Sequence, residues 1–159
     1  MVRIVLFQPE IPPNTGNVAR SCAATETELH LIEPLGFTID DRQLRRAGLD
    51  YWPWVQLERH RDFECFQAQR LRRGGRLLAF SSQGGIPYTA CRYRADDWLL
   101  FGRESEGLPA SVLACANERL TIPMARHRQR EGGGVRSLNL SVSVAVGLFE
   151  ALRQIAAEA

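Results

Sequence analysis

Short apolar runs alternate along this chain with segments of helical pattern, and this alternation constrains the fold more than any other feature of the sequence. The runs predicted as strands lie at residues 2–7, 29–33, 54–57, 76–81, 97–101 and 119–122. Strands that are joined through helices of about ten residues run parallel, because each crossover returns the chain to the same end of the sheet. The sequence therefore predicts an α/β fold, with a mostly parallel sheet and helices on both of its faces.

Capping residues and apolar spacing predict the helices. Asn14 or Thr15 is expected to cap a helix over about 16–25, and Asp62 one that runs to about residue 71. Thr38 and Asp41 have capping-box spacing ahead of a basic helix that stops at Gly48. A short helix is expected over 109–116. The last predicted helix, over about 139–157, carries an apolar stripe at helical spacing: Val144, Leu148, Ala151 or Leu152, and Ile155.

Length and composition exclude disordered, collagen-like and disulfide-scaffold proteins. The chain has 159 residues, of which 45% are hydrophobic and 24% charged, and it is long enough to bury a core as one domain over 1–159. Its longest apolar runs fall far short of the roughly 20 residues that cross a bilayer, so no membrane span is expected. The first residues lack a signal-peptide pattern, which predicts a cytoplasmic location.

Cysteine and histidine spacing predicts no metal site. The cysteines are widely separated, with no CxxC pair, and are predicted to be buried small hydrophobes in a reducing compartment: Cys22, Cys65, Cys91 and Cys115. The histidines show neither HxxxH spacing nor a Cys/His ligand pattern: His30, His60 and His127.

Arginine clusters point to a polyanionic partner. The net charge is only +2, yet all 20 basic residues are arginine, whose rigid fork of donors suits phosphate and whose plane stacks on bases. The arginines gather at residues 42–46, 70–76 and 126–136. Each cluster alone is explained equally well as a solvated surface, but together they favour a nucleic acid.

Familiar nucleotide-binding motifs are missing from the sequence. Gly102 and Gly107 have the spacing of P-loop glycines, but Leu108 and Pro109 stand in place of the lysine and hydroxyl that hold phosphate and magnesium. No GxGxxG follows the first predicted strand, and no GxSxG turn marks a nucleophile. ATP hydrolysis and a dinucleotide site are therefore disfavoured.

Three segments follow predicted strands, at the end of the sheet where open α/β folds bind ligands: residues 14–20, 100–109 and 122–141. In the first, Asn17 and Arg20 are three residues apart and share a helix face near its positive end, which suits a phosphate or an oxyanion. Taken singly, each segment is explained as readily by a helix cap or a turn.

Taken together, the order and spacing of these segments resemble the three motifs of the SPOUT methyltransferases, in the branch that methylates ribose 2′-hydroxyls of RNA. The resemblance spans nearly the whole chain. Two further segments, QPEIPPNTGN at 8–17 and RRAGLDYW at 45–52, are similar to those of the members that modify the wobble cytidine or uridine of tRNA. The resemblance implies that activity, together with a trefoil knot in the carboxyl-terminal part of the sheet, an exception to the rule against threaded chains.

The resemblance also implies a cofactor, S-adenosylmethionine, and no metal. By position in the motifs, the residues expected to line its site are Phe80, Gly102, Ile122 and Ser137, with Met124 and Leu138 adjoining. These are mostly apolar side chains and loop backbone, a surface that fits a purine plane bonded by main-chain groups.

The resemblance assigns Arg20 to the arginine that acts on the ribose hydroxyl. Because a guanidinium does not normally accept a proton, we expect it to hold a substrate phosphate and to stabilise the developing alkoxide, while the phosphate or water takes the proton. Glu104 is expected either to orient Arg20 or to meet the ribose, and Asn139 to tie the last motif to the knot. Further substrate contacts are expected from Asn14, Asn17, Arg45 and Arg46.

Several alternatives stay open at this level. The stretch 125–136 is longer than the resemblance predicts, and is either a basic lip for RNA or a tolerated insertion. The family's homodimer is expected to complete the site across the interface, with Trp52 and Trp54 in that interface or, for at least one of them, in the core. Methylation of ribosomal RNA or of another tRNA position, and a catalytically silent RNA-binding module, are the competing functions.

Overall fold

A single parallel sheet organises the molecule, whose computed structural model describes residues 1–39, 51–125 and 135–158. Its strands are β1 (Arg3–Phe7), β2 (Glu28–Ile32), β3 (Leu57–His60), β4 (Leu77–Phe80), β5 (Ile86–Pro87), β6 (Trp98–Phe101) and β7 (Glu118–Thr121). They lie in the order β3-β2-β1-β6-β4-β7-β5, and every pair is parallel. The predicted parallel α/β sheet is confirmed.

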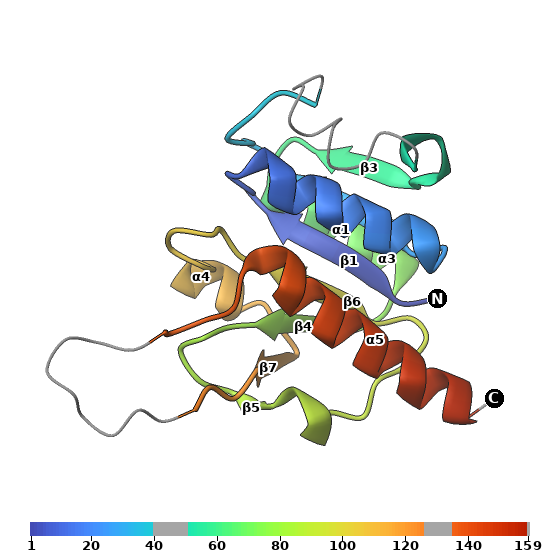
Figure 1. Cartoon of the computed structure of the whole chain (residues 1–159), viewed down its shortest axis with the longest axis vertical. Helices are drawn as coiled ribbons and strands as arrows, with labels where there is room; N and C mark the ends of the chain where they lie inside the picture. Colours follow the sequence, from blue (N-terminus) through green and yellow to red (C-terminus); the bar gives the residue numbers. More distant parts are fainter. Residues whose placement is uncertain (40–50, 126–134, 159) are drawn as a thin grey trace, which may run out of the picture.

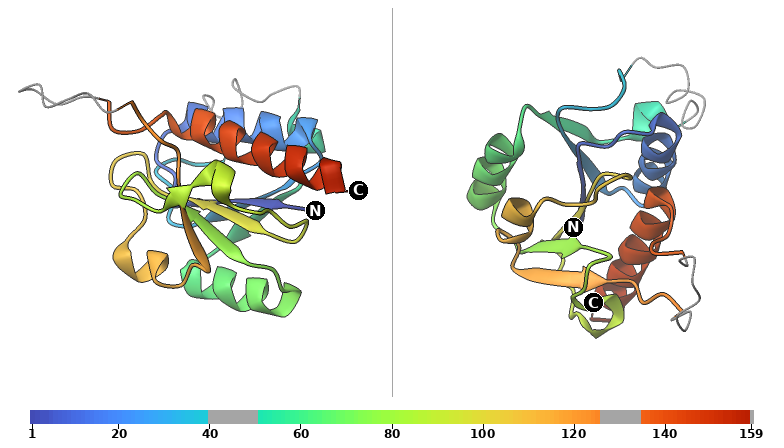
Figure 2. Two further views of the ribbon diagram at one scale, coloured as in Figure 1. Left: turned by 90° about the horizontal axis from the view of Figure 1, so that it is seen from below. Right: turned by 90° about the vertical axis from the view of Figure 1, so that its left-hand side faces the viewer.

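Helices cover both faces of this sheet. The described elements are α1 (Pro12–Ala24), α3 (Phe63–Arg73), α4 (Ala110–Leu113) and α5 (Leu140–Glu158), with 3₁₀ turns η1 (Trp52–Trp54) and η2 (Tyr88–Ala90). Helices α1 and α5 lie side by side on one face, and α3 and α4 lie on the other (Figures 1 and 2). This is the layered arrangement that the alternating pattern predicts.

Side chains on the two faces of the central strands β1, β2, β4 and β6 pack into two separate cores. In β1, Ile4 and Leu6 point to the side covered by α1 and α5, whereas Val5 and Phe7 point to the side covered by α3 and α4. Because successive side chains of a strand alternate between faces, a strand buried on both sides reads as a continuous apolar run. All four residues are at most 5% exposed, which explains why the first run of the sequence is apolar at every position from Ile4 to Phe7.

Helix α5 is apolar enough and long enough, by composition and length alone, to cross a membrane. Core helices pass the same test, and here Val144, Leu148 and Ala151 are fully buried in the core on the α1 side of the sheet. These are residues of the predicted inner stripe, so that prediction is confirmed, and Leu152 and Ile155 pack against the same core.

Helix α1 begins earlier than the capping residues predict. Its N-cap is Ile11, and Pro12 and Pro13 occupy the first helical positions. Proline fits there because its fixed φ suits the first turn and its missing N–H would have had no intrahelical acceptor. The prediction that Asn14 or Thr15 caps this helix was therefore wrong. Both are buried inside the first turn.

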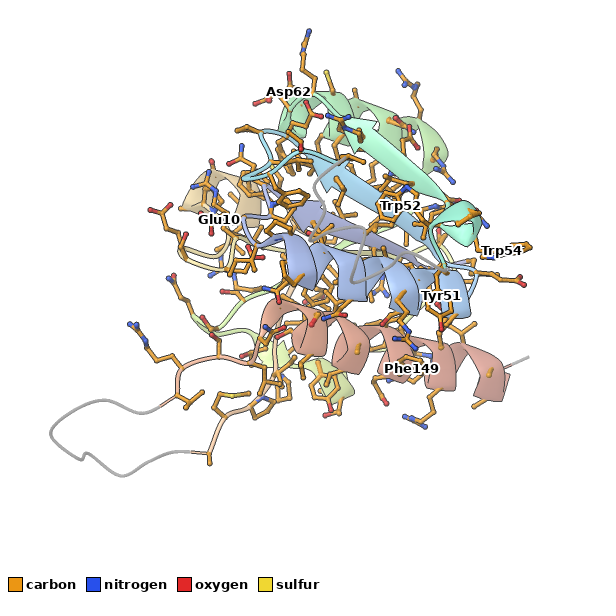
Figure 3. The ribbon with its side chains drawn as sticks, turned by 45° about the horizontal axis from the view of Figure 1, so that its top comes forward. Glu10, Tyr51, Trp52, Trp54, Asp62 and Phe149 are labelled. Atoms are coloured by element: carbon orange, nitrogen blue, oxygen red, sulfur yellow. The ribbon has the colours of Figure 1, made fainter. Side chains whose placement is uncertain are left out.

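The segment before β3 also differs from the prediction. A strand over 54–57 is replaced by the turn η1, in which the Trp54 amide donates to the Tyr51 carbonyl at 2.9 Å, and β3 starts at Leu57. Trp52 packs against the core, whereas Trp54 is 73% exposed at the edge of the molecule (Figure 3). The expectation that at least one of these tryptophans joins the core is confirmed.

Some predictions lie outside the described residues or need correction. The basic helix expected to end at Gly48, with Arg45 and Arg46, falls in residues 40–50, outside the described part. The knot stays a prediction, since the path of the chain includes residues 126–134, also outside it. Asp62 caps α3 as predicted, accepting from the Cys65 amide at 2.7 Å. The cysteines are all free thiols, but Cys115 is exposed and Cys65 partly so, because Cys115 lies in the turn after α4 and Cys65 in the first turn of α3.

Candidate active site

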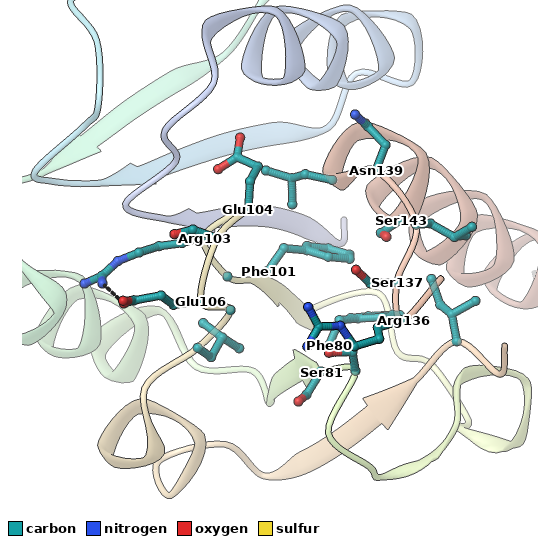
Figure 4. A pocket seen from close by; sticks show the side chains of 18 of the residues that line it. Phe80, Ser81, Phe101, Arg103, Glu104, Glu106, Arg136, Ser137, Asn139 and Ser143 are labelled. Carbon is teal, nitrogen blue, oxygen red and sulfur yellow. Dashed lines mark hydrogen bonds and ion pairs between the residues drawn. The ribbon is translucent and has the colours of Figure 1, made fainter. Parts of the chain in front are cut away.

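A cavity of about 640 Å³ opens where β4, β6 and β7 end (Figure 4). Three stretches form its walls: the ends of these strands, the loop 102–108 that follows β6, and residues 135–140 that lead into α5. Its volume falls within the usual range for small-molecule sites, and its place at the carboxyl ends of parallel strands is where α/β folds bind ligands.

The cavity brings together most of the site residues that the sequence predicts. Among the residues that line it are Phe80, Gly102, Ile122, Met124, Ser137 and Leu138, together with Glu104 and Asn14. These residues come from positions more than 100 apart in the chain. Arg20 and Asn17 do not line it; both are exposed on α1.

Two stacked aromatic rings line the inner wall of the cavity. Phe80 ends β4 and Phe101 ends β6, and their ring centroids lie 4.5 Å apart with planes 17° from parallel. Gly147 of α5 faces this stack, and a Cβ there would come within 2.7 Å of the Phe80 ring. The absence of a side chain at this helical position therefore lets α5 approach the stack.

The loop after β6 folds back on itself. Arg103 and Gly107 exchange two backbone hydrogen bonds, of 3.2 and 3.0 Å. A Cβ on residue 102 would lie 2.3 Å from the Gly107 carbonyl carbon, so only glycine fits at position 102. The Arg103 guanidinium pairs with Glu106 at 2.8 Å and bonds to Gln8, which ties the loop to the end of β1.

Glu104 anchors the start of α1 to this loop. One carboxylate oxygen accepts from the Glu10 amide at 2.9 Å, and the other accepts from the Ile11 amide and the Asn14 Nδ2, both at 3.2 Å. A carboxylate suits this place, since the first N–H groups of a helix lack intrahelical acceptors and carry partial positive charge. The sequence predicts that Glu104 either orients Arg20 or meets the ribose; within this chain its carboxylate binds the start of α1.

A chain of amides continues from Glu104 to α5. Asn14 is 6% exposed and accepts from Asn139 Nδ2 at 2.9 Å, while Asn139 Oδ1 accepts from the amide and the hydroxyl of Ser141 in the first turn of α5. Asn139 thus caps α5 and also ties the third motif to the first. Because Asn14 uses both ends of its amide in this chain, it holds the cavity wall together, a different role from the substrate contact predicted for it.

Glu104→Gln is expected to lower the free energy of unfolding by about 2 kcal/mol, because the amide loses the charge and turns an N–H toward backbone donors. Urea unfolding measures this loss. Glu106→Gln is the matched control, since Glu106 lies on the same loop, its side chain is 72% exposed, and it pairs only with Arg103 among the described residues. The control is expected to change stability by less than about 0.5 kcal/mol. Equal effects of the two substitutions would contradict the anchoring role.

Arg20 lies on the outer surface of α1 and interacts with Tyr51. Its guanidinium carbon is 4.7 Å from the centre of the Tyr51 ring, and one terminal nitrogen donates to the Tyr51 hydroxyl at 3.2 Å. The structure therefore separates the two groups of predicted residues, with the cofactor set in the cavity and Arg20 outside the cavity of its own chain.

Sequence reasoning missed several contributors to the cavity region, among them Arg136, Glu10 and Ser105. Arg136 lines the cavity next to Ser137. Glu10 accepts from the amide and the hydroxyl of Ser105, which adds a second tie between the β1 and β6 loops and lowers the pKa of the Glu10 carboxyl through these hydrogen bonds. Glu10 lies within the segment 8–17 used for the resemblance, so its position there was the available signal.

A second polar cluster lies at the opposite end of the sheet order, between β2 and β3. His30 Nδ1 and His60 Nε2 are 3.0 Å apart, and His30 Nε2 lies 3.2 Å from a Glu28 oxygen. His30, His60 and Glu58 form a group of three side chains whose potential metal-ligand atoms lie within 4.8 Å of one another. Spacing along the sequence misses this cluster because its members meet across two strands. The histidine–histidine and histidine–carboxylate bonds satisfy His30 without an ion.

This cluster predicts acid sensitivity. Burial lowers the pKa of His30 to about 4, although Glu28 and Glu58 act in the other direction, and burial also lowers the pKa of His60. Below its ordinary pKa of 6.5, His30 binds a proton in the unfolded chain but stays neutral in the folded one. Stability is therefore lost as the pH falls from 6.5 toward 4, and the free energy of unfolding is expected to be about 2 kcal/mol lower at pH 5 than at pH 7.

Urea unfolding at the two pH values measures this difference. His30→Gln is the control, because a glutamine retains hydrogen-bonding groups but does not titrate in this range, so the difference between pH 5 and pH 7 is expected to shrink. A wild-type protein equally stable at both values would contradict the assignment.

Comparison with known proteins agrees with this arrangement. The model of the SpoU rRNA Methylase family matches residues 1–149. A tRNA (cytidine(34)-2′-O)-methyltransferase of Yersinia pestis is 46% identical over 160 residues, covering 98% of this chain and 94% of the relative. A solved structure described as structural insights into the 2-OH methylation of C/U34 on tRNA has a TM-score of 0.88 and 51% identity, covering 97% and 95% of the two chains. An AdoMet-bound rRNA methyltransferase from Sinorhizobium meliloti, 24% identical with a TM-score of 0.83 over 96% of this chain and 56% of its own, shares the fold.

Proposed function

Because this chain belongs to the SpoU methylase family, we propose that it methylates the ribose 2′-oxygen of cytidine or uridine 34, the wobble nucleotide of tRNA, with S-adenosylmethionine as methyl donor. The observation that carries the proposal is the cavity. It collects all six residues that the motifs assign to the cofactor, in a chain that matches relatives named for this reaction over nearly their whole length. An enzyme of this kind acts in the cytoplasm, where tRNA is processed, and needs no membrane.

The cavity fits S-adenosylmethionine. Apolar side chains of Phe80, Ile122, Met124 and Leu138 offer a surface for the purine, and the loop that begins at Gly102 also lines the cavity, so we propose that its main-chain groups bond to the purine edge. When bound, the cofactor supplies a methyl group on a cationic sulfur, which needs no metal for activation. The chain's own task is to align the ribose oxygen and to stabilise its developing charge.

Arg20 is the residue proposed to act on the ribose. Its guanidinium holds a phosphate of the substrate by two parallel hydrogen bonds and lowers the energy of the partial negative charge that grows on the 2′-oxygen. A guanidinium does not take up the hydroxyl proton, which passes to the substrate phosphate or to water. Glu104 acts indirectly in this proposal, as a positioning residue that fixes α1, the helix that carries Arg20, against the cofactor loop.

We further propose that the site is completed in a homodimer. Since Arg20 lies outside the cavity of its own chain, a site that contains both needs the Arg20 of a second copy. On α5, Val142 and Phe149 are 46% and 55% exposed, and their spacing of seven residues places both on one face of the helix. Tyr51 and Phe149 both project on the side of the molecule seen in Figure 3, where α1 and α5 lie. An exposed apolar strip of this kind suits a symmetric interface.

Transfer of a tritiated methyl group to tRNA tests the proposed function. A transcript with cytidine at position 34 is compared with the same transcript carrying 2′-deoxycytidine there, which lacks the acceptor oxygen. Label in the first and none in the second supports the proposal. Label in both would indicate a ribose at another position, and ribosomal RNA is the further substrate to assay. Absence of label from every RNA would favour the catalytically silent binding module.

A further inference from the structure

The arginines of the described chain fall into two kinds according to their partners. Several pair with carboxylates and so have their charge largely neutralised: Arg3, Arg59, Arg61, Arg73, Arg76, Arg103 and Arg153. Arg20 has no such partner among the residues that the structure describes. It lies instead against the face of Tyr51 at 4.7 Å and donates to the hydroxyl of that residue at 3.2 Å.

An aromatic face holds a guanidinium differently from a carboxylate. The attraction comes from the negative face of the ring, which orients the cation and carries no net charge. A guanidinium held in this way keeps its full positive charge for an incoming anion, and its donors that do not face the hydroxyl stay free. A carboxylate in the same place would compete with the substrate phosphate for those donors.

Tyr51 is itself fixed by the turn that it begins. Its carbonyl accepts the Trp54 amide at 2.9 Å, and the next residue, Trp52, packs against the core, as do Val55 and Leu57. Tyr51 as a residue is 37% exposed, so it is held from the backbone side while its outer surface meets solvent and Arg20. Helix α1 and the turn η1 are in contact, which keeps the distance between the two side chains short.

From this geometry we infer that Tyr51 is a positioning residue for methyl transfer, which orients the Arg20 guanidinium toward a phosphodiester of the RNA substrate without neutralising it. The inference rests on the proposed function, because it assumes that Arg20 meets the RNA. An arginine side chain has many rotamers in solution, and it loses this freedom when it binds the phosphate. Tyr51 restricts the side chain before the RNA arrives, which lowers the cost of ordering it.

Kinetics of methyl transfer to tRNA in a double-mutant cycle test the inference. Tyr51→Leu removes the aromatic face and is expected to lower kcat/KM for tRNA about fivefold to tenfold, whereas Tyr51→Phe keeps the face and is expected to stay within about threefold of the wild type. In an Arg20→Ala background, Tyr51→Leu is expected to have no further effect, because its action passes through Arg20. The affinity for S-adenosylmethionine is expected to be unchanged in every variant.

A second measurement does not depend on activity. In protein labelled with ¹⁵N-arginine, the ring current of Tyr51 shifts the guanidinium resonance of Arg20. This shift is expected to persist in Tyr51→Phe and to disappear in Tyr51→Leu.

The inference is overturned if Tyr51→Leu leaves kcat/KM unchanged, or if it lowers kcat/KM by the same factor with and without Arg20, as a general loss of structure would. The failure of the proposed function looks different, because the wild-type protein would then transfer no methyl group to tRNA, whereas the Tyr51-dependent shift of the Arg20 resonance would still be seen. If Arg20→Ala alone retains full methyl transfer, the role of Arg20 is wrong, and that of Tyr51 is wrong with it.

Discussion

Arg20→Ala is expected to lower kcat for tRNA methylation about 10²- to 10³-fold while the affinity for S-adenosylmethionine stays unchanged. The size follows from the loss of one preorganised donor to charge that develops in the transition state. The cofactor affinity is expected to hold because Arg20 does not line the cavity of its chain. Steady-state kinetics with tritiated cofactor and calorimetric titration of the cofactor measure the two quantities.

Arg20→Lys is the matched control for this prediction. It keeps the charge on a long side chain but loses the planar fork of donors, so its activity is expected to fall between that of the wild type and that of Arg20→Ala. Normal turnover of Arg20→Ala would remove the residue from the reaction. A parallel loss of cofactor affinity would instead indicate that the substitution disturbs the cavity.

The second large effect is expected at Gly102, where alanine should weaken the binding of S-adenosylmethionine at least tenfold and destabilise the fold by about 1–3 kcal/mol. A methyl group at this position would stand 2.3 Å from the Gly107 carbonyl carbon, so the backbone of the loop 102–108 must move. Gly147→Ala is the matched comparison. It also adds one methyl group, but the nearest atom, at 2.7 Å, is the tip of the Phe80 ring, which shifts more easily than backbone.

Calorimetric titration and thermal unfolding of both variants separate binding from stability. A Gly102→Ala protein with wild-type affinity for the cofactor would contradict the assignment of this loop to the site. An effect of Gly147→Ala as large as that of Gly102→Ala would show that the crowding of backbone is not the cause.

The two variants together also test the dimer. A chain with Arg20→Ala keeps an intact cavity, and a chain with Gly102→Ala keeps an intact Arg20. In a random mixture half of the dimers are mixed, and each of these contains one complete site if Arg20 serves the partner's cavity. About one quarter of the wild-type activity is then expected to return on mixing. Activity that does not rise after subunit exchange would place both groups in the same chain.

The sequence predicts the sheet better than the connections. The buried parts of strands such as β1 (Ile4 to Phe7) and β6 are continuous apolar runs because both of their faces are covered, and this signal is local. The start of α1 was predicted wrongly because polar residues suggested a cap, whereas Pro12 and Pro13 already satisfy the first turn. The two-residue strand β5 is too short for any pattern to reveal.

For the site as well, the sequence predicts some features and not others. Motif order singled out residues that the fold brings to one cavity. The partners of Glu104 and Asn14 lie about 90 and 125 positions away in the chain, and no local rule predicts them. The contact between Arg20 and Tyr51 is also long-range, although both residues stand in segments that the resemblance had singled out. Patterns identified the residues, and only the fold supplied their partners.

The amide chain from Glu104 through Asn14 to Asn139 has a consequence for how the protein is made. A ribosome delivers the start of α1 long before the loop after β6, and it delivers the start of α5 later still. The hydrogen bonds that Asn14 makes to Glu104 and Asn139 can therefore form only after most of the polypeptide has been synthesised. Contacts this distant in sequence slow folding, so the nascent chain acquires binding competence only near the end of its synthesis.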